Sequence, residues 1–265
     1  MTHMPEGDTV WLAARRMNQA LAGKELIRGE LRVPQLAALD LAGRTVAEVV
    51  ARGKHMLFRF TDGYTLRSHF RMDGSWHIQP AGQPWQGGPA FTVRAVLSTA
   101  QVDCVGYRLY DLAYVATAEE SSLVGHLGPD LLGPDWDADE ALRRLFAHPE
   151  AEIGVALLDQ LNLAGIGTLY RTEGLFLAGI RPHRLVGDIA GDLLAGSVDR
   201  IRRMMLHNRE RPQQSTTGSL RRGETHWVFE RDGRPCRRCW TTILRGEQGP
   251  SPHQRVSYWC PTCQS

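Results

Sequence analysis

Lysine is scarce in this chain, although basic residues are not. Of the 31 Lys and Arg residues among 265, only Lys24 and Lys54 are lysines. The planar guanidinium of arginine does not replace the compact ammonium of lysine at every kind of site. A lysine that persists against such a bias toward arginine is a candidate for a specific role, and we single out Lys54.

Long apolar runs are also missing. No stretch of about 18 apolar residues occurs, so we expect no membrane-spanning helix. The first residues show no basic stretch followed by an apolar core, the pattern of a secretory signal peptide. We therefore expect a cytoplasmic, intracellular protein. A hydrophobic content of 42% over 265 residues is enough for one large domain or two modest ones.

Charge is unevenly spread along the chain, although the net charge is only +2. Residues 200–245 contain twelve arginines and four acidic residues. A basic region in a nearly neutral chain favours a polyanionic partner about as strongly as it favours a solvated surface. Charge alone leaves these two interpretations open.

The first half of the sequence predicts a helix followed by β-structure. Apolar residues recur at helical spacing over residues 9–22, and Gly23 is suited to end that helix. Residues 25–117 then divide into short, often alternating segments, and Asp62-Gly63 is a strong hairpin signal. We expect a β-sandwich or flattened barrel packed with the helix.

The second half changes to helical patterns, near residues 138–147, 151–161, 168–178 and 188–208. Between the second and third pattern lies "NLAGIGTLY", a glycine-containing turn that opens a helix, as in helix-turn-helix joints. The start of such a helix is a natural phosphate site, although an ordinary helical hairpin is the better explanation of this stretch taken alone. Residues 212–226 have the composition of a polar linker or mobile loop.

Cysteine spacing is the strongest local signal. Cys236, Cys239, Cys260 and Cys263 form two C-x2-C pairs separated by twenty residues, which predicts a closed tetrahedral site for one structural Zn²⁺. Two disulfides are the alternative, which a reducing compartment disfavours. The residues between the pairs predict a hairpin with "RVSYW" as its return strand, and metal binding would supply its folding energy.

Two further residues can be interpreted by their position inside or outside the cysteine pattern. Arg255 lies near the far end of the predicted hairpin, where it is placed either to bind phosphate or to remain a solvated surface arginine. Cys104 is outside the pattern, and in a strand-like segment it is expected to be a buried apolar filler.

Five segments, taken in order, resemble the formamidopyrimidine-DNA glycosylase and endonuclease VIII family. They are "MPEGD" at 4–8, "RGKHMLF" at 52–58, "SHFRMDGSW" at 68–76, "LLDQLNLAGIGTLYRTEGLF" at 157–176, and "RDGRPCRRC" with "RVSYWCPTCQ" near the end. The resemblance implies an α+β multidomain fold. Its expected parts are an N-terminal helix plus β-sandwich at 1–120, a helix-two-turn-helix domain at 121–225 and a zinc-finger hairpin at 226–265.

The same resemblance implies a bifunctional DNA glycosylase and abasic-site lyase in base excision repair. The expected partner is damaged double-stranded DNA, bound by a monomer, and the strand is cut by β,δ-elimination through a proline Schiff base. "PEG", "VFERDGRPC" and a short linker before the zinc finger are similar to the endonuclease VIII branch, which removes oxidised pyrimidines. Two alternatives stay open: an oxidised-purine glycosylase, and a non-catalytic damaged-DNA binding module if Pro5 is not N-terminal. A generic zinc-ribbon protein leaves the first 120 residues unexplained.

The resemblance also assigns expected roles to single residues. Pro5, Glu6 and Lys54 would be catalytic, with an active form that begins at Pro5 after Met1 to Met4. The expected DNA-binding residues are Arg71, Met72, Thr168 and Arg255, with Met72 as the apolar wedge that replaces an extruded base and Asp73 beside it. Two residues depart from the family pattern: Thr168 stands where asparagine is usual, and Thr9 where endonuclease VIII often has a second glutamate.

Overall fold

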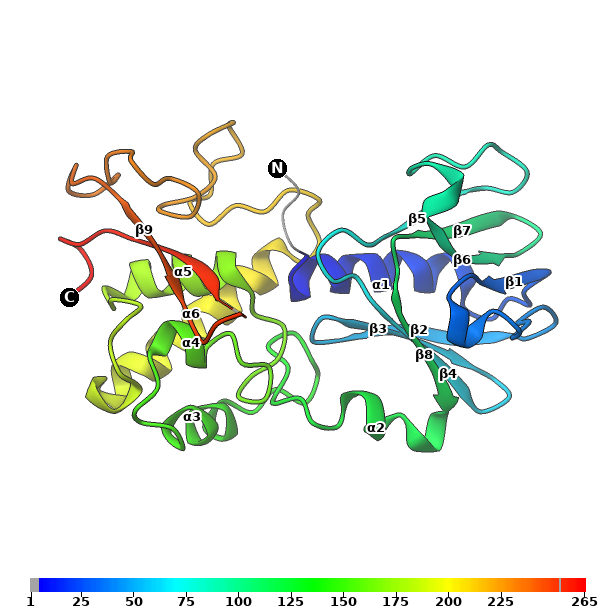
Figure 1. Ribbon diagram of the computed structural model, residues 1–265, viewed down its shortest axis with the longest axis horizontal. Helices are drawn as coiled ribbons and strands as arrows, with labels where there is room; N and C mark the ends of the chain where they lie inside the picture. The colour runs from blue at the N-terminus through cyan, green and yellow to red at the C-terminus, as the bar shows by residue number, and fades with distance from the viewer. Residues whose placement is uncertain (1–4, 253) are drawn as a thin grey trace. The chain divides into compact units, whose positions relative to one another are not determined.

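The computed structural model describes residues 5–252 and 254–265, in two compact units that divide between His126 and Leu127 (Figure 1). The expected processing point after Met4 concerns residues 1–4, which lie outside the described part of the chain. Within the described part, no helix has the length and apolar character needed to cross a membrane.

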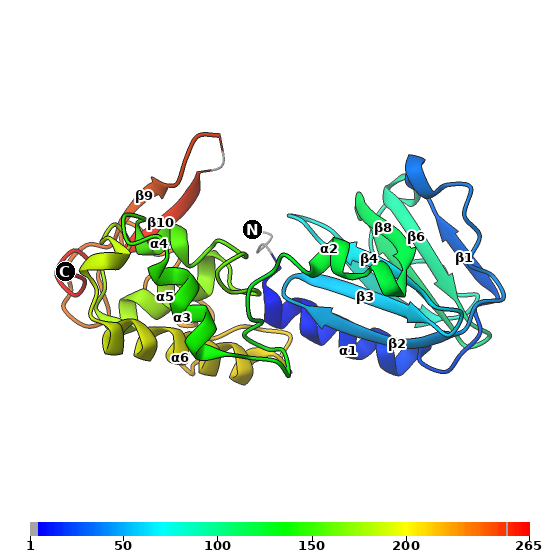
Figure 2. The same cartoon turned by 90° about the horizontal axis from the view of Figure 1, so that it is seen from below.

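The first unit begins with helix α1 (Gly7–Leu21), which confirms the predicted N-terminal helix. Its apolar side is buried through Val10, Met17 and Leu21 and packs against β2 and β3. The side chain of Asn18 accepts a hydrogen bond of 2.7 Å from the backbone N–H of Val49 on β2. The helix is thereby fixed along one sheet, as Figure 2 shows.

Two antiparallel four-stranded sheets form the rest of this unit, so the predicted sandwich is confirmed. Their inner faces and α1 share one apolar core that includes Met56, Phe58, Leu97 and the predicted filler Cys104. One sheet has the order β1-β6-β7-β5, with β1 (Arg28–Leu31), β5 (Ser75–Pro80), β6 (Val93–Ser98) and β7 (Val102–Tyr107). The other has the order β2-β3-β4-β8, with β2 (Val46–Arg52), β3 (His55–Phe60), β4 (Tyr64–His69) and β8 (Asp111–Ala116).

Short helical turns connect these strands. They are η1 (Pro34–Leu36), η2 (Ala90–Thr92), η3 (Thr117–Glu119) and α2 (Ser121–Val124). The predicted hairpin at Asp62-Gly63 joins β3 to β4 and is confirmed.

The second unit is built around helix α5, which packs against α6 on one side and against strand β10 on another. Strands β9 and β10 form the antiparallel hairpin predicted between the cysteine pairs. The elements are α3 (Ala138–Phe146), α4 (Ile153–Ala156), α5 (Thr168–Ala178), η4 (Val186–Asp188), α6 (Gly191–Asn208), β9 (Leu244–Gln248) and β10 (Arg255–Trp259).

Helix α4 is much shorter than the predicted helix over 151–161, which is wrong beyond Ala156. Side chains divert the backbone after this single turn. The Asn162 amide donates to the carbonyl of Ala156 at 2.9 Å, and the Gln160 amide donates to the carbonyl of Leu158 at 3.0 Å. Asn and Gln side chains that bind nearby carbonyls offer the backbone an alternative to helix.

The segment 212–226 has no regular secondary structure, but it is anchored. Asn208 at the end of α6 donates its amide to the carbonyl of Ser215 and accepts the Ser215 N–H, both at 3.0 Å. Ser215 is buried, so the polar composition that suggested a mobile linker instead supplies the bonds of a folded turn.

Candidate functional site

Pro5 and Glu6 lie at the start of α1. Pro5 is half-buried, whereas the Glu6 side chain is buried, with only 2% of the residue exposed. Glu6 is the residue before the helix, and its carbonyl accepts the N–H of Val10 at 3.0 Å. The positive end of the helix dipole therefore lies beside Pro5 and stabilises the carboxylate of Glu6. Thr9, which replaces a second glutamate, is exposed.

Lys54 occupies the tight turn between β2 and β3. Arg52 and His55 pair across that turn, so Gly53 and Lys54 are its two central residues, and Gly53 adopts a φ of 57°. Glycine tolerates this left-handed conformation without steric cost. The turn holds Lys54, which is half-buried, at the end of a rigid hairpin.

Two histidines flank Lys54 from adjacent strands. His55 pairs with His69 of β4, and the ring centroids are 4.7 Å apart. Burial lowers the pKa of His55 to about 3 and that of His69 to about 4, and the positive charge of Lys54 contributes to the second shift. Both rings are therefore neutral at pH 7.

The turn from Phe70 to Gly74 presents Met72. The Gly74 N–H donates to the Phe70 carbonyl at 2.9 Å and closes the turn, while Met72 is 64% exposed. On either side of Met72, charged side chains are paired with residues at or just before the start of β8. Arg71 contacts Asp111 at 2.7 Å, and Asp73 contacts Arg108 at 3.6 Å.

The structure brings several of these first-unit residues together. His55 begins β3 and faces His69, which ends β4. The Lys54 turn and the Arg71–Met72 turn are therefore neighbours at the same end of these two strands. Figures 1 and 2 both place the first turn of α1 at the end of the unit where β3 begins. Sequence reasoning did not identify Asp111 or His69 as members of this group: Asp111 lies outside the quoted segments, and His69 lies within "SHFRMDGSW" but was given no role of its own.

The second unit places Thr168 and Arg255 on neighbouring elements. Thr168 is the first residue of α5 and is 7% exposed, and Gln160 fixes the turn before it by accepting the Gly165 N–H at 2.9 Å. Arg255 is exposed at the start of β10, opposite Gln248. A cavity of about 280 Å³ adjoins Arg255 and is lined by Gly154, Val155, Leu158, Asp159, Arg171, Gln248, Gly249 and Pro250.

Arg171 was not identified from the sequence, yet it lines this cavity and hydrogen-bonds to the backbone of two neighbouring segments. It is fully buried, and its guanidinium donates to the carbonyl of Gly154 at 3.2 Å and to that of Val256 at 2.5 Å. Every residue from Thr168 to Phe176 is buried. A basic residue inside so apolar a helical segment was the available signal, because a buried arginine must be paired.

Glu173, two residues later on α5, anchors the chain that enters the cysteine region. Its carboxylate accepts the backbone N–H groups of Trp227, Val228 and Phe229 at 2.8, 2.8 and 2.9 Å, and the Thr216 hydroxyl also donates to it. Burial raises the pKa of Glu173, and these donors act against that shift. Helix α5 thus holds the segment before the first cysteine pair.

The four predicted ligands form one cluster. The Sγ atoms of Cys236, Cys239, Cys260 and Cys263 all lie within 4.8 Å of one another. The shortest separations, 3.4 and 3.9 Å, are far longer than a disulfide of about 2.05 Å, and all five cysteines are unbridged. Burial raises the pKa of Cys260 and of Cys263, whereas hydrogen bonds with Thr241 lower that of Cys239 to about 6. Four thiolates this close would repel one another, so a cation between them would stabilise the cluster. The donor set therefore fits a tetrahedral metal site of the zinc type.

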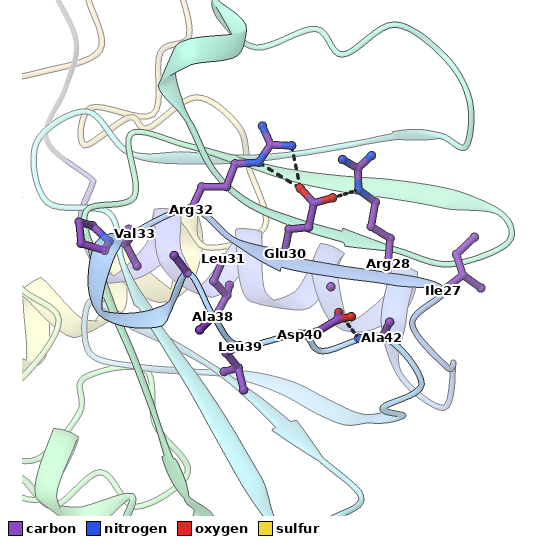
Figure 3. A pocket seen from close by; sticks show the side chains of 13 residues that line it. Ile27, Arg28, Glu30, Leu31, Arg32, Val33, Ala38, Leu39, Asp40 and Ala42 are labelled. Atoms are coloured by element: carbon purple, nitrogen blue, oxygen red, sulfur yellow. Dashed lines mark hydrogen bonds and ion pairs between the residues drawn. The ribbon is translucent and has the colours of Figure 1, made fainter.

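A shallow pocket of about 660 Å³ lies at the β1 edge of the first unit and involves none of the residues predicted from the sequence. Figure 3 shows Arg28 and Arg32 directed at Glu30, which they contact at 2.5 and 2.8 Å. Both guanidinium groups also stack on Trp85, with their Cζ atoms 5.2 and 5.5 Å from the centroid of its ring. Both arginines are therefore already paired with Glu30 and Trp85, and we do not count this pocket as part of the candidate site.

Family models match most of the chain in three consecutive pieces. Residues 4–110 match the formamidopyrimidine-DNA glycosylase N-terminal domain, and residues 127–218 match the formamidopyrimidine-DNA glycosylase H2TH domain. Residues 233–265 match the zinc finger found in FPG and IleRS. The three matches follow the β-sandwich, the helical region and the cysteine hairpin.

Curated relatives extend over the full length of the chain. It is 51% identical to a probable endonuclease 8 2 of Streptomyces coelicolor, over 99% of this chain and 94% of the relative. It is 41% identical to the DNA-(apurinic or apyrimidinic site) lyase Nei2 of Mycolicibacterium smegmatis, over 99% of each chain. An endonuclease 8 of Escherichia coli is 30% identical, over 98% of this chain and 100% of the relative.

Solved structures share the fold. A Lactococcus lactis formamidopyrimidine-DNA glycosylase bound to DNA containing an abasic site aligns with a TM-score of 0.81. The alignment covers 98% of this chain and 99% of that one at 22% identity, which establishes the common architecture.

Proposed function

Since the chain belongs to the formamidopyrimidine-DNA glycosylase and endonuclease VIII family, closer to the endonuclease VIII branch, and is a DNA glycosylase with abasic-site lyase activity, we propose that it removes oxidised pyrimidines through a Schiff base at Pro5. The observation that carries the proposal is the position of Pro5 and buried Glu6 at the positive end of α1. The setting is base excision repair.

The chemistry requires a nucleophilic amine, and the amine of an N-terminal proline is suited to it. With an ordinary α-amino pKa of about 7.7–8.0, roughly a tenth of such a group is unprotonated at pH 7. The adjacent helix N-terminus favours the neutral form further. The Pro5 nitrogen attacks C1′ of the deoxyribose and gives up its proton, and the bond to the damaged base breaks so that the base leaves with a proton. The C1′–O4′ bond then breaks, O4′ takes up a proton, and the ring-opened iminium is an electron sink. Loss of a C2′ proton then expels the 3′ phosphate, and a second elimination expels the 5′ phosphate.

Glu6 and Lys54 serve this reaction in different ways. The Glu6 carboxylate moves protons at the sugar ring oxygen and at the leaving groups. The Lys54 ammonium holds a phosphate beside the abasic sugar. The neutral His55 and His69 rings support this role, since they add no positive charge of their own near Lys54. Met72 enters the base stack in place of the extruded nucleotide, which lowers the cost of keeping that nucleotide out, and Arg71 addresses the opposite strand.

The second unit is proposed to hold the DNA backbone. Thr168 at the start of α5 and Arg255 at the start of β10 bind phosphate oxygens. The four cysteines hold one structural Zn²⁺, which stabilises the hairpin that carries Arg255. We propose a monomer that acts in the cytoplasm, with the three-domain division at residues 1–120, 121–225 and 226–265.

Borohydride trapping on DNA with a single abasic site tests the proline mechanism. One form of the protein should begin at Pro5, and a second should retain the four preceding residues, with both N-termini verified by mass spectrometry. An amide nitrogen has no available lone pair, so the first form should crosslink and cut, while the second should bind without crosslinking. Efficient trapping by the verified extended form would reject Pro5 as nucleophile and direct attention to Lys54.

A further inference from the structure

Arg71 adopts a backbone conformation that is unusual for its residue type. Its φ is 54°, in the left-handed region, where residues with a Cβ are uncommon and are held by their surroundings. The next residue is the exposed Met72. The left-handed conformation therefore sets the direction in which Met72 leaves the sheet.

Two side chains hold Arg71 in this conformation. The backbone N–H of Arg71 donates to Nδ1 of His69 at 3.0 Å, and its guanidinium contacts Oδ2 of Asp111 at 2.7 Å. One contact fixes the backbone and the other fixes the side chain. Both partners belong to the sheet, where His69 and Asp111 pair directly across β4 and β8.

Asp111 is itself held in place. Its other oxygen accepts the guanidinium of Arg67 at 2.5 Å, and its side chain is 19% exposed. Burial opposes ionisation, but Arg67 and Arg71 together hold the pKa of this carboxyl below its usual value. A carboxylate shared between two arginines and mostly shielded from water resists the screening that weakens surface ion pairs.

His69 is also fixed. An Nδ1 atom that accepts the Arg71 N–H carries no proton, which the lowered pKa of this ring permits at neutral pH. The ring also packs against that of His55, the residue after Lys54, with the two ring centroids 4.7 Å apart. The same ring therefore contacts both the turn that presents Met72 and the turn that presents Lys54.

We propose that Asp111 and His69 form a clamp that holds the Arg71–Met72 turn ready to enter the DNA base stack, and that both are positioning residues for base extrusion. The proposal rests on the proposed function, because it presumes that Met72 acts as the wedge. A turn that is ordered before binding spends no conformational entropy when it inserts. Loss of the clamp should therefore slow steps that need the wedge and spare steps that do not.

Two substrates separate these steps. A duplex with one dihydrouracil requires the lesion to leave the stack, whereas a single strand with a preformed abasic site has no opposite strand and no pair to open. Under single-turnover conditions, Asp111→Asn should slow excision from the duplex by about tenfold and leave single-strand cleavage within about twofold of wild type. A 2-aminopurine placed beside the lesion should report a slower rise in fluorescence, which a purely structural role would not cause.

A matched control lies just after β8, where Glu120 pairs with Arg59 of the same sheet. Glu120 accepts two hydrogen bonds from Arg59, at 2.7 and 2.9 Å, and its side chain is 14% exposed. Glu120→Gln makes the same chemical change away from the clamp, so it should leave the ratio of duplex to single-strand rates unchanged. An equal change of that ratio in both variants would reject the clamp.

A double-mutant cycle protects the test against a folding defect. The Arg71 side chain is 65% exposed, so Arg71→Ala should fold normally. If Asp111 acts through Arg71, Asp111→Asn should have little further effect on the duplex rate in that background. Additive effects, an unchanged duplex rate, or equal losses on both substrates would each overturn the clamp. Failure of the wild-type protein to cut either substrate would reject the proposed function, and the clamp with it.

Discussion

The buried guanidinium of Arg171 donates to the backbone carbonyl of Val256, and this bond joins helix α5 to the strand that begins with Arg255. The two residues are 85 positions apart in the sequence. Helix α5 also carries Thr168 at its start, so one helix sets both candidate phosphate contacts of the second unit. Four further properties of the molecule can be tested alongside this one.

Removal of the Arg171 charge should loosen the hairpin. Arg171→Met leaves the carbonyls of Gly154 and Val256 without their donor and should reduce the free energy of unfolding of the second unit by about 3 kcal/mol. Urea denaturation measures this loss. Arg203→Met is the control, since its exposed side chain pairs with Asp199 on the same helix, and it should change stability by less than about 0.5 kcal/mol. Equal losses would show that Arg171 has no special anchoring role.

Arg255→Ala should weaken binding to abasic-site DNA and reduce the slope of log affinity against log salt concentration by about one unit. The reason is the loss of one phosphate contact by an exposed residue, so hairpin folding should be unaffected. Titrations at several salt concentrations measure both quantities. Arg143→Ala, which removes an exposed arginine already paired with Glu140, should leave the slope unchanged. An unaltered slope for Arg255→Ala would show that this residue is a solvated surface arginine that binds no phosphate.

Elemental analysis should find one zinc per chain. Chelation should weaken DNA binding, because four adjacent thiolates repel one another without a cation and the hairpin loses its folding energy. The β-sandwich has its own apolar core and should remain folded when metal is removed from the full chain, as judged by amide hydrogen exchange of residues 5–126 with and without chelator. Protein purified without metal, or with two disulfides, would contradict the zinc assignment.

Stability of the first unit should depend on pH through two half-buried histidines, His55 and His69. The folded-state pKa values are about 3 for His55 and about 4 for His69, both below the ordinary 6.5. Between pH 6.5 and 4 the unfolded chain binds more protons, so stability is complete above 6.5 and falls as the pH decreases, by up to about 1.4 kcal/mol per pH unit for each histidine. His55→Phe should flatten this slope in urea denaturation, whereas His148→Ala, at an exposed position of the second unit, should not.

Substrate preference distinguishes the two branches of the family. The chain should excise thymine glycol or dihydrouracil faster than 8-oxoguanine, since its relatives at 51 and 41% identity carry endonuclease 8 2 and Nei2 names. Single-lesion duplexes compared at equal enzyme concentration, each with a lesion-free duplex as control, measure the preference. A clear preference for 8-oxoguanine would place the activity in the formamidopyrimidine branch.

The sequence alone determined those features that depend on neighbours along the chain. The cysteine spacing predicted a metal-binding cluster because each C-x2-C pair is a local structure. Periodicity predicted α1 and α5 to within two residues, since the burial of a helix face repeats locally. The same reasoning extended α4 too far, because it did not include the side-chain bonds of Gln160 and Asn162 to the backbone.

Only the tertiary structure decided which distant groups meet. The sequence analysis gave no role to Asp111, which lies outside the quoted segments, or to His69, Arg171 and Glu173, which lie within them. Each became significant through its partners: Arg71 for the first two, Val256 and the 227–229 segment for the others. The residue type of a polar side chain does not show whether it lies on a solvated surface or inside a core. Its role is set by burial and by the partners that burial requires, and both of these arise when the chain folds.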